Sequence, residues 1–124
     1  MKIVDILKLE AAAFFIATVW AYYLVGASWW LFLALILIPD VFMVGYIKNS
    51  KIGALVYNTG HMYVVPLLLL GTYLLFHIPV LLPISIIWLA HISMDRMLGY
   101  GLKLDTGFKD THLGVVGKKS KAVC

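Results

Sequence analysis

The stretch around which the chain is organised reads WLAHISMDRMLGYGLK, from Trp88 to Lys103. His91 and Asp95 stand four residues apart at the end of an apolar run, so on a helix they share one face. An imidazole and a carboxylate on one face are common metal ligands and acid/base partners. Because an aspartate at the centre of a membrane helix costs roughly 2.5–3.5 kcal/mol, an ionisable residue there indicates a functional site. The alternative is that Asp95 and Arg96 lie near the membrane surface and are simply hydrated.

The composition excludes a soluble globular domain. Hydrophobic residues make up 63% of the 124 residues and charged residues 13%, whereas soluble domains have about 45–50% and about 25%. This length accommodates four spans of about 20 residues in one domain, 1–124. The single cysteine, Cys124, excludes a disulfide framework. The net charge of +4 comes from residues at membrane edges and in the tail, so we predict contact with membrane lipids and no nucleic-acid binding.

We predict an all-α fold, a four-helix transmembrane bundle with spans at about 5–25, 29–47, 52–76 and 79–99 and a short C-terminal segment at 100–124. The first segment could instead be a cleaved signal peptide, but its length and Glu10 favour a span. Pro39 and Pro66 predict kinks in the second and third helices, because proline removes a helical hydrogen bond and crowds the preceding turn.

The basic residues predict the orientation. All ten Lys and Arg residues lie at the N-terminus, in the turn at 48–51, or from Arg96 onward. By the positive-inside rule, both termini and the middle turn are cytoplasmic. This topology brings five polar residues on four helices to similar depth in the cytoplasmic leaflet, namely Glu10, Asp40, His61, His91 and Asp95. We expect them to converge on one site, whereas His77 is interpreted as interfacial.

The tail adds a further candidate. His112 lies in the apolar, glycine-bounded segment 108–114, and we expect this segment to fold over the cytoplasmic end of the bundle as a lid. The alternative is a loose basic tail that contacts lipid headgroups.

Four motifs carry a resemblance to known proteins: PDxxMxGY from Pro39, YNxxH from Tyr57, HxxxDRxxGYGLK from His91 and FKxTHLG from Phe108. Together they resemble a family of small bacterial four-helix membrane proteins catalogued as a domain of unknown function. The resemblance covers almost the whole chain and implies an integral membrane protein. We expect a multi-pass protein of the bacterial inner (cytoplasmic) membrane. The His-x-x-x-Asp and Thr-His patterns are also similar to membrane-bound metal-dependent hydrolases, although the early histidine motif of those enzymes has no counterpart here.

The first functional hypothesis is a metal-dependent membrane enzyme of the hydrolase type. Its metal ligands would be His61, His91, Asp95 and His112. Glu10 or Asp40 would act as general base or support the ligands. Tyr57 and Asn58 would orient groups in the site. Zinc is the first candidate metal, with iron or manganese as alternatives. The substrate would be a lipid or another apolar molecule that enters from the bilayer.

Three alternatives remain open. A metal-free isomerase or cyclase would use buried Asp40 or Glu10 as its acid. A proton- or ion-coupled transporter would have to form a homo-oligomer, because one four-helix unit is small for a gated pathway. A structural network of His, Asp and Glu would only fix the packing of the helices.

Overall fold

The computed structural model describes residues 2–100, 102, 110–111 and 114–115. Its helical elements are α1 (Ile3–Val25), α2 (Trp29–Leu35), the 3-10 helix η1 (Ile38–Ile47), α3 (Ser50–His61), α4 (Val64–Phe76) and α5 (Leu81–Leu98). Two short strands, β1 (Asp110–Thr111) and β2 (Gly114–Val115), pair antiparallel. The predicted all-α bundle of four helical segments is confirmed, with the second and third segments each made of two helices. The short strand pair was not predicted.

The prolines break the helices completely, where only kinks were expected. α2 ends at Leu35, and η1 begins at Ile38 with Pro39 as its second residue. α3 ends at His61, and Met62 then adopts an extended conformation (φ −101°, ψ 154°). Pro66 occupies the first turn of α4, where its missing N–H leaves no helical donor for the carbonyl of Met62. Each break places a candidate site residue, Asp40 or His61, at a helix end.

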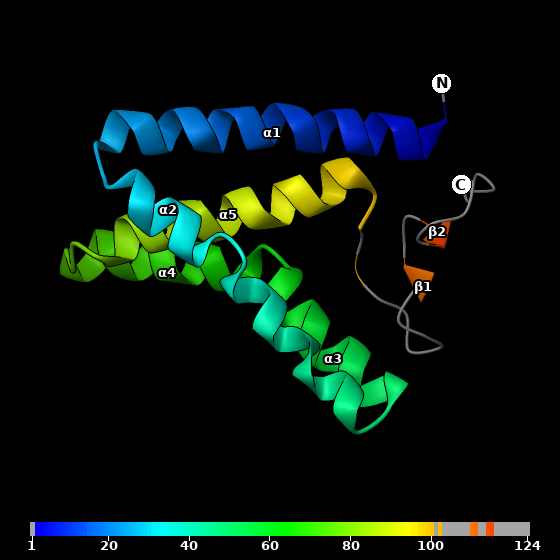
Figure 1. The fold of residues 1–124 in the computed structure, drawn as a ribbon. Helices are drawn as coiled ribbons and strands as arrows, with labels where there is room; N and C mark the ends of the chain where they lie inside the picture. Colours follow the sequence, from blue (N-terminus) through cyan, green and yellow to red (C-terminus); the bar gives the residue numbers. More distant parts are fainter. Residues whose placement is uncertain (1, 101, 103–109, 112–113, 116–124) are drawn as a thin grey trace.

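The helices pack as two groups (Figure 1). α5 packs along both α1 and α4, whereas η1 packs along α3. The apolar core is formed by Tyr22, Ile86 and Ile87, against which residues of α2 pack. The start of α1, the turn between η1 and α3, and the end of α5 lie toward the same end of the molecule. This arrangement agrees with a chain that crosses the membrane an even number of times. Which side of the membrane this end faces stays a prediction.

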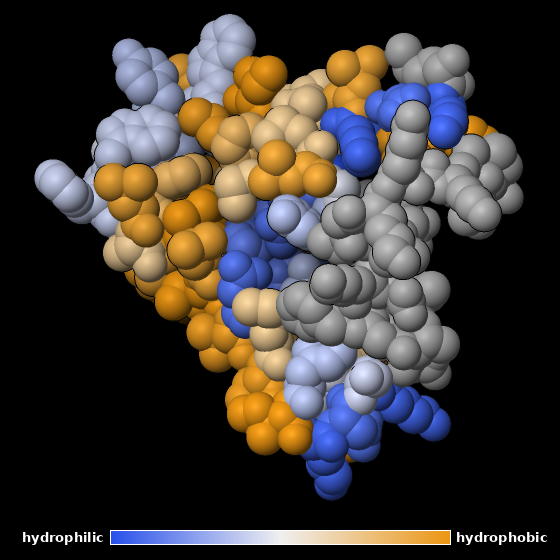
Figure 2. All heavy atoms as spheres, turned by 45° about the vertical axis from the view of Figure 1, so that its right-hand side comes forward, coloured by the Kyte–Doolittle hydropathy of each residue, from blue (hydrophilic) through white to orange (hydrophobic). Residues whose placement is uncertain are grey.

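Three segments are long and apolar enough to cross a membrane: Trp29–Ile47, Ser50–Phe76 and Leu81–Leu98. α1, with 23 residues, carries Asp5, Lys8 and Glu10 in its first turns, and its role as a fourth span stays a prediction. Figure 2 shows extensive apolar surface around a recessed hydrophilic area. Many large apolar side chains are exposed, Trp30 and Ile47 among them, as expected for a surface that meets lipid rather than water.

Glycines on α3 set the close approach of η1. A Cβ atom built on Gly60 would lie 2.5 Å from the ring of Phe42 and 2.9 Å from its Cβ, and a Cβ on Gly53 would overlap the ring of Tyr46. Only glycine therefore lets the two helices come this close. Phe42 lies two residues after Asp40 and Gly60 one residue before His61, so this contact also sets the distance between these two candidate site residues.

We predict that Gly60→Ala lowers the melting temperature of the purified protein, because the added methyl group overpacks against Phe42 at a cost of about 1–3 kcal/mol. Gly71→Ala on α4 is the matched control, since nothing lies within 4 Å of a Cβ at that position. Thermal unfolding in detergent measures both variants. Equal melting temperatures for the two would contradict the close-approach argument.

Candidate metal centre

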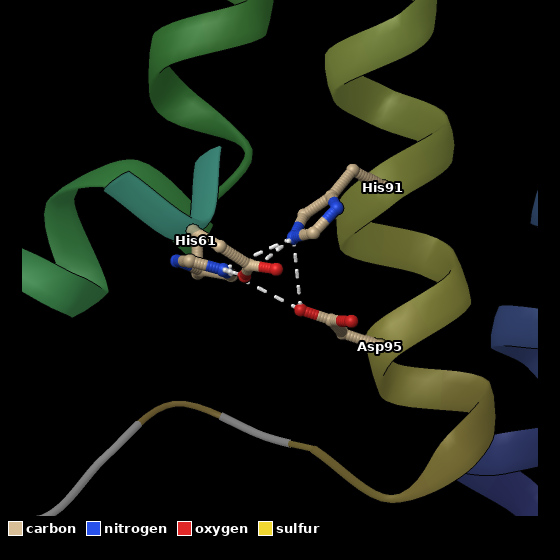
Figure 3. Close-up of side chains that lie close together, drawn as sticks. His61, His91 and Asp95 are labelled. Carbon is tan, nitrogen blue, oxygen red and sulfur yellow. Dashed lines mark hydrogen bonds and ion pairs between the residues drawn. The ribbon is translucent and has the colours of Figure 1, made fainter. Parts of the chain in front are cut away.

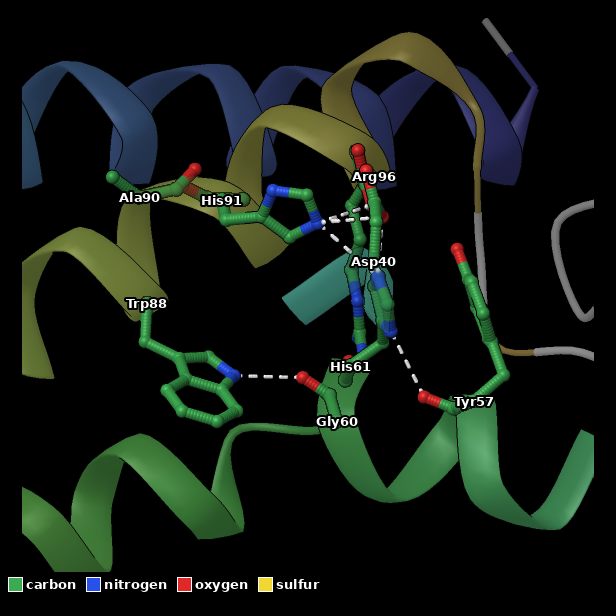
Figure 4. Close-up of polar contacts among 10 residues, drawn as sticks. Asp40, Tyr57, Gly60, His61, Trp88, Ala90, His91 and Arg96 are labelled. Carbon is green, nitrogen blue, oxygen red and sulfur yellow. Dashed lines mark hydrogen bonds and ion pairs between the residues drawn. The ribbon is translucent and has the colours of Figure 1, made fainter. Parts of the chain in front are cut away.

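Three elements bring four ionisable side chains together. Asp40 comes from η1, His61 is the last residue of α3, and His91 and Asp95 stand one turn apart on α5. One candidate ligand atom from each residue lies within 4.8 Å of all the others. Figure 3 shows His61, His91 and Asp95 pointing toward one another from facing elements, and Figure 4 shows Asp40 at the same point. These residues could hold a metal ion.

The donor atoms are spaced like the ligands of a single metal ion. His61 Nε2 lies 3.1 Å from Asp40 Oδ1, 3.4 Å from Asp95 Oδ2 and 3.1 Å from His91 Nε2. His91 Nε2 lies 3.2 Å from Asp40 Oδ1 and 3.0 Å from Asp95 Oδ2. Four ligands about 2.0–2.1 Å from a tetrahedral zinc ion would lie about 3.3–3.4 Å apart. Five of the six distances among the donor atoms are therefore close to those of a tetrahedral site, and all the donor atoms lie within 4.8 Å of one another.

The hydrogen bond at the far side of His61 directs its Nε2 into the cluster. Nδ1 of this ring lies 2.9 Å from the carbonyl oxygen of Tyr57, which can only accept, so Nδ1 carries the proton. In the neutral ring Nε2 then presents a lone pair toward the carboxylates of Asp40 and Asp95, which also present lone pairs. A bound cation would turn these repulsive contacts into coordination bonds.

Protonated rings are the alternative, and the distance between the rings opposes it. If both histidines were charged, both Nε2 atoms would carry protons while lying 3.1 Å apart. If only one were charged, its Nε2–H could donate to the lone pair of the other ring, but that lone pair would also face carboxylate oxygens. A divalent ion with two neutral imidazoles and two carboxylates satisfies all four donors and has no net charge, which suits a low-dielectric interior.

Burial distinguishes Asp40 from the other three residues. The side chains of His91, His61 and Asp95 are 0%, 4% and 12% exposed, whereas that of Asp40 is 33% exposed. Access to the centre is therefore through the side of η1.

Contacts behind the ligands hold the end of α3 in place (Figure 4). The ring of Tyr57 stacks on His61, with ring centroids 3.8 Å apart and an interplanar angle of 7°. Trp88 Nε1 donates to the carbonyl of Gly60 at 2.7 Å, and an Arg96 N–H donates to the carbonyl of His61 at 3.3 Å. These carbonyls belong to the last turn of α3 and have no partner within it. In the part of the chain that the structure describes, Nδ1 of His91 has no hydrogen-bond partner, so the orientation of this ring depends on Nε2.

The structure brings some of the predicted site residues together and separates others. Asp40, His61, His91 and Asp95 form the cluster, and Asp40 joins the donor set although a general base was expected there. Tyr57 contributes its carbonyl and ring behind His61, and its neighbour Asn58 lies on the same turn of α3. Glu10 is not a member of the cluster and lines a separate cavity. His112 lies outside the described residues. Of the lid expected at 108–114, the structure describes only 110–111 and 114.

Sequence reasoning missed Trp88 and Arg96 as groups that hold the site. Arg96 was considered only as a hydrated residue near the membrane surface, whereas its guanidinium reaches the backbone of His61 and lies 4.9 Å from the centroid of the Tyr63 ring. The signal available in the sequence was Pro66, which indicates an interruption near His61, and carbonyls at an interrupted helix end require donors from another helix.

Comparisons with known proteins give one match. The model of a family described as Domain of unknown function (DUF4260) matches residues 4–116. No curated protein and no solved structure matches the chain. The resemblance to a membrane family of unknown function is confirmed, and no likeness to hydrolases is found.

We predict that Trp88→Phe lowers the stability of the protein by about 1–3 kcal/mol, because the buried carbonyl of Gly60 loses its donor. Trp30→Phe is the control, since Trp30 is 81% exposed. Denaturation in detergent compares the two variants. If Trp88→Phe were no less stable than Trp30→Phe, Trp88 would have no role in holding the end of α3.

Proposed function

The chain belongs to the family described as Domain of unknown function (DUF4260). We propose that it is an integral membrane protein that binds a divalent metal ion through Asp40, His61, His91 and Asp95. The observation that carries the proposal is the set of five donor distances of 3.0–3.4 Å among these side chains. Two imidazole nitrogens and two carboxylate oxygens suit zinc first, and iron or manganese as alternatives.

We further propose that the centre serves a hydrolase-like reaction on a lipid or another apolar substrate at the cytoplasmic leaflet. Metal sites in helix bundles are built from inward Asp, Glu and His residues on facing helices, and a bound divalent metal supplies Lewis acidity for hydrolysis. The exposure of Asp40 supports this role, because a purely structural site would be buried on all sides. Asp40, on η1, is the most exposed of the four proposed ligands.

The other residues have supporting roles in this proposal. His61 and His91 hold the metal with Asp95, and the carbonyl of Tyr57 keeps His61 in the tautomer that coordinates through Nε2. The apolar surface around the centre is consistent with a substrate that arrives from the bilayer rather than from water.

A structural polar network without metal is the second candidate. The observation that favours it is that each histidine Nε2 lies within ion-pair distance of both carboxylates. In that case the cluster would fix the packing of η1, α3 and α5 and carry no chemistry.

We predict that the protein, purified in detergent from cells supplied with zinc, iron and manganese, contains about one equivalent of metal per chain. His61→Ala and His91→Ala should each lose most of it. His77→Asn is the control, because His77 lies exposed at the end of α4 with φ 54°, a conformation that asparagine tolerates. Elemental analysis of the four preparations gives the answer, and a folded protein without metal would support the structural network instead.

The reaction has its own test. We expect the protein in lipid nanodiscs to cleave one class within a panel of chromogenic long-chain esters and phosphoesters. His61→Ala should lower kcat/KM at least about hundredfold, since altered support of a ligand alone costs 10–100-fold, while His77→Asn should retain full activity. Metal-loaded protein that cleaves no member of the panel would exclude the hydrolase proposal and leave the metal site.

A further inference from the structure

A cavity lies on the other side of α5, between α1, α4 and α5. Its volume is about 430 Å³, within the range of about 300–1,000 Å³ that is usual for small-molecule sites. Apolar and aromatic side chains form most of its wall, among them Leu7, Phe14, Leu67 and Leu89. Two of the lining residues are charged, Glu10 and Arg96.

Arg96 lines the cavity, and no carboxylate of the described residues forms an ion pair with it. Within the described residues, it donates to the carbonyl of His61 and contacts the face of the Tyr63 ring. A guanidinium group has several N–H donors in a planar fork, so donors remain after this single hydrogen bond. A cation in a mostly apolar cavity favours an anionic ligand group, and the fork matches a carboxylate bidentately.

The cavity adjoins the candidate metal centre through two residues. Arg96 follows Asp95 in the chain and hydrogen bonds the backbone of His61, so it contacts one member of the centre and is covalently joined to another. A ligand group held by Arg96 would therefore lie beside the centre, while an alkyl chain would extend along the apolar wall.

We propose that this cavity binds a long-chain monocarboxylate with its head on Arg96, and that the substrate of the centre is the corresponding acyl ester. The second half of this inference rests on the proposed hydrolase function. In ester hydrolysis, the oxygen of water bonds to the acyl carbon and the acyl C–O bond breaks. One proton of the water goes to the departing alcohol oxygen and the other is released from the acid, which leaves a carboxylate as the product.

Glu10 restricts the charge of the ligand. It lines the same cavity, so a ligand meets a carboxylate as well as the guanidinium. A single negative charge on the ligand is tolerated beside Glu10, whereas a phosphate monoester carries about −1.5 to −2 and is repelled more strongly. This difference selects a carboxylate head over a phosphate head.

The test measures equilibrium binding of oleate, oleyl alcohol and oleoyl lysophosphatidate to the full chain in nonionic detergent. Oleate should bind at least about tenfold more tightly than the alcohol and more tightly than the lysophosphatidate. Arg96→Gln should weaken oleate binding about tenfold without changing that of the alcohol, Arg96→Lys should retain most of it, and Glu10→Gln should strengthen it. Equal binding of acid and alcohol, or tighter binding of the lysophosphatidate, would overturn the proposal.

A second pair of variants tests the cavity itself without touching its charges. Leu67→Trp adds volume at a residue that lines the cavity, whereas Leu68→Trp adds the same volume at an exposed neighbour on α4 that does not line it. Leu67→Trp should weaken oleate binding and Leu68→Trp should leave it unchanged. Equal effects of the two variants would place the oleate elsewhere.

Metal content measured in the same preparations separates the two proposals. Oleate binding in a protein that holds no metal would overturn the metal function and support the cavity assignment. A metal-loaded wild-type protein that does not bind oleate would overturn the cavity assignment and leave the metal centre in place.

Discussion

The break between α3 and α4 is the constraint on which the site depends. α3 ends at His61 because Met62 is extended, and the carbonyls of the last turn of α3 then need donors that lipid does not provide. Trp88 and Arg96 of α5 supply them. The same contacts fix the end of α3 against α5, so the need to satisfy the backbone also sets the distance between His61 and His91.

The second half of the site depends on close packing. Gly60 admits the ring of Phe42, which brings η1 onto the end of α3 and Asp40 beside His61. The four ionisable side chains then lie where η1, α3 and α5 meet. A looser contact between any two of these elements would separate the side chains. Electrostatics and packing are coupled here: the helix contacts hold two imidazoles and two carboxylates within 4.8 Å of one another, and either a bound cation or protons on the rings would balance the charge of the carboxylates.

Much of the fold and of the site could be predicted from the sequence, because the spacing of residues along a helix and their depth in the membrane can be worked out for each helix by itself. The spacing of His91 and Asp95, the two prolines and the matching depth of Asp40 and His61 all indicate a shared site. Depth does not determine which face of a helix points inward, which is why Glu10 was expected in the cluster but lines the cavity instead. The donors to the end of α3 depend on contacts between helices, although the spacing of Gly53 and Gly60, seven residues apart on one face, could have indicated the close approach of η1.

The geometry of α5 explains how two sites can adjoin without merging. His91 and Asp95, four residues apart, face the candidate metal centre, whereas Leu89 and Arg96, seven apart, line the cavity. One helix thus separates four mutually close polar groups from a mostly apolar space, and each site keeps the environment that its chemistry requires. Arg96 is the exception, since its long side chain lines the cavity and still reaches the carbonyl of His61. A charge placed on the cavity side of this arginine therefore acts on the same residue that orients the centre, and this contact gives the two sites a direct physical link.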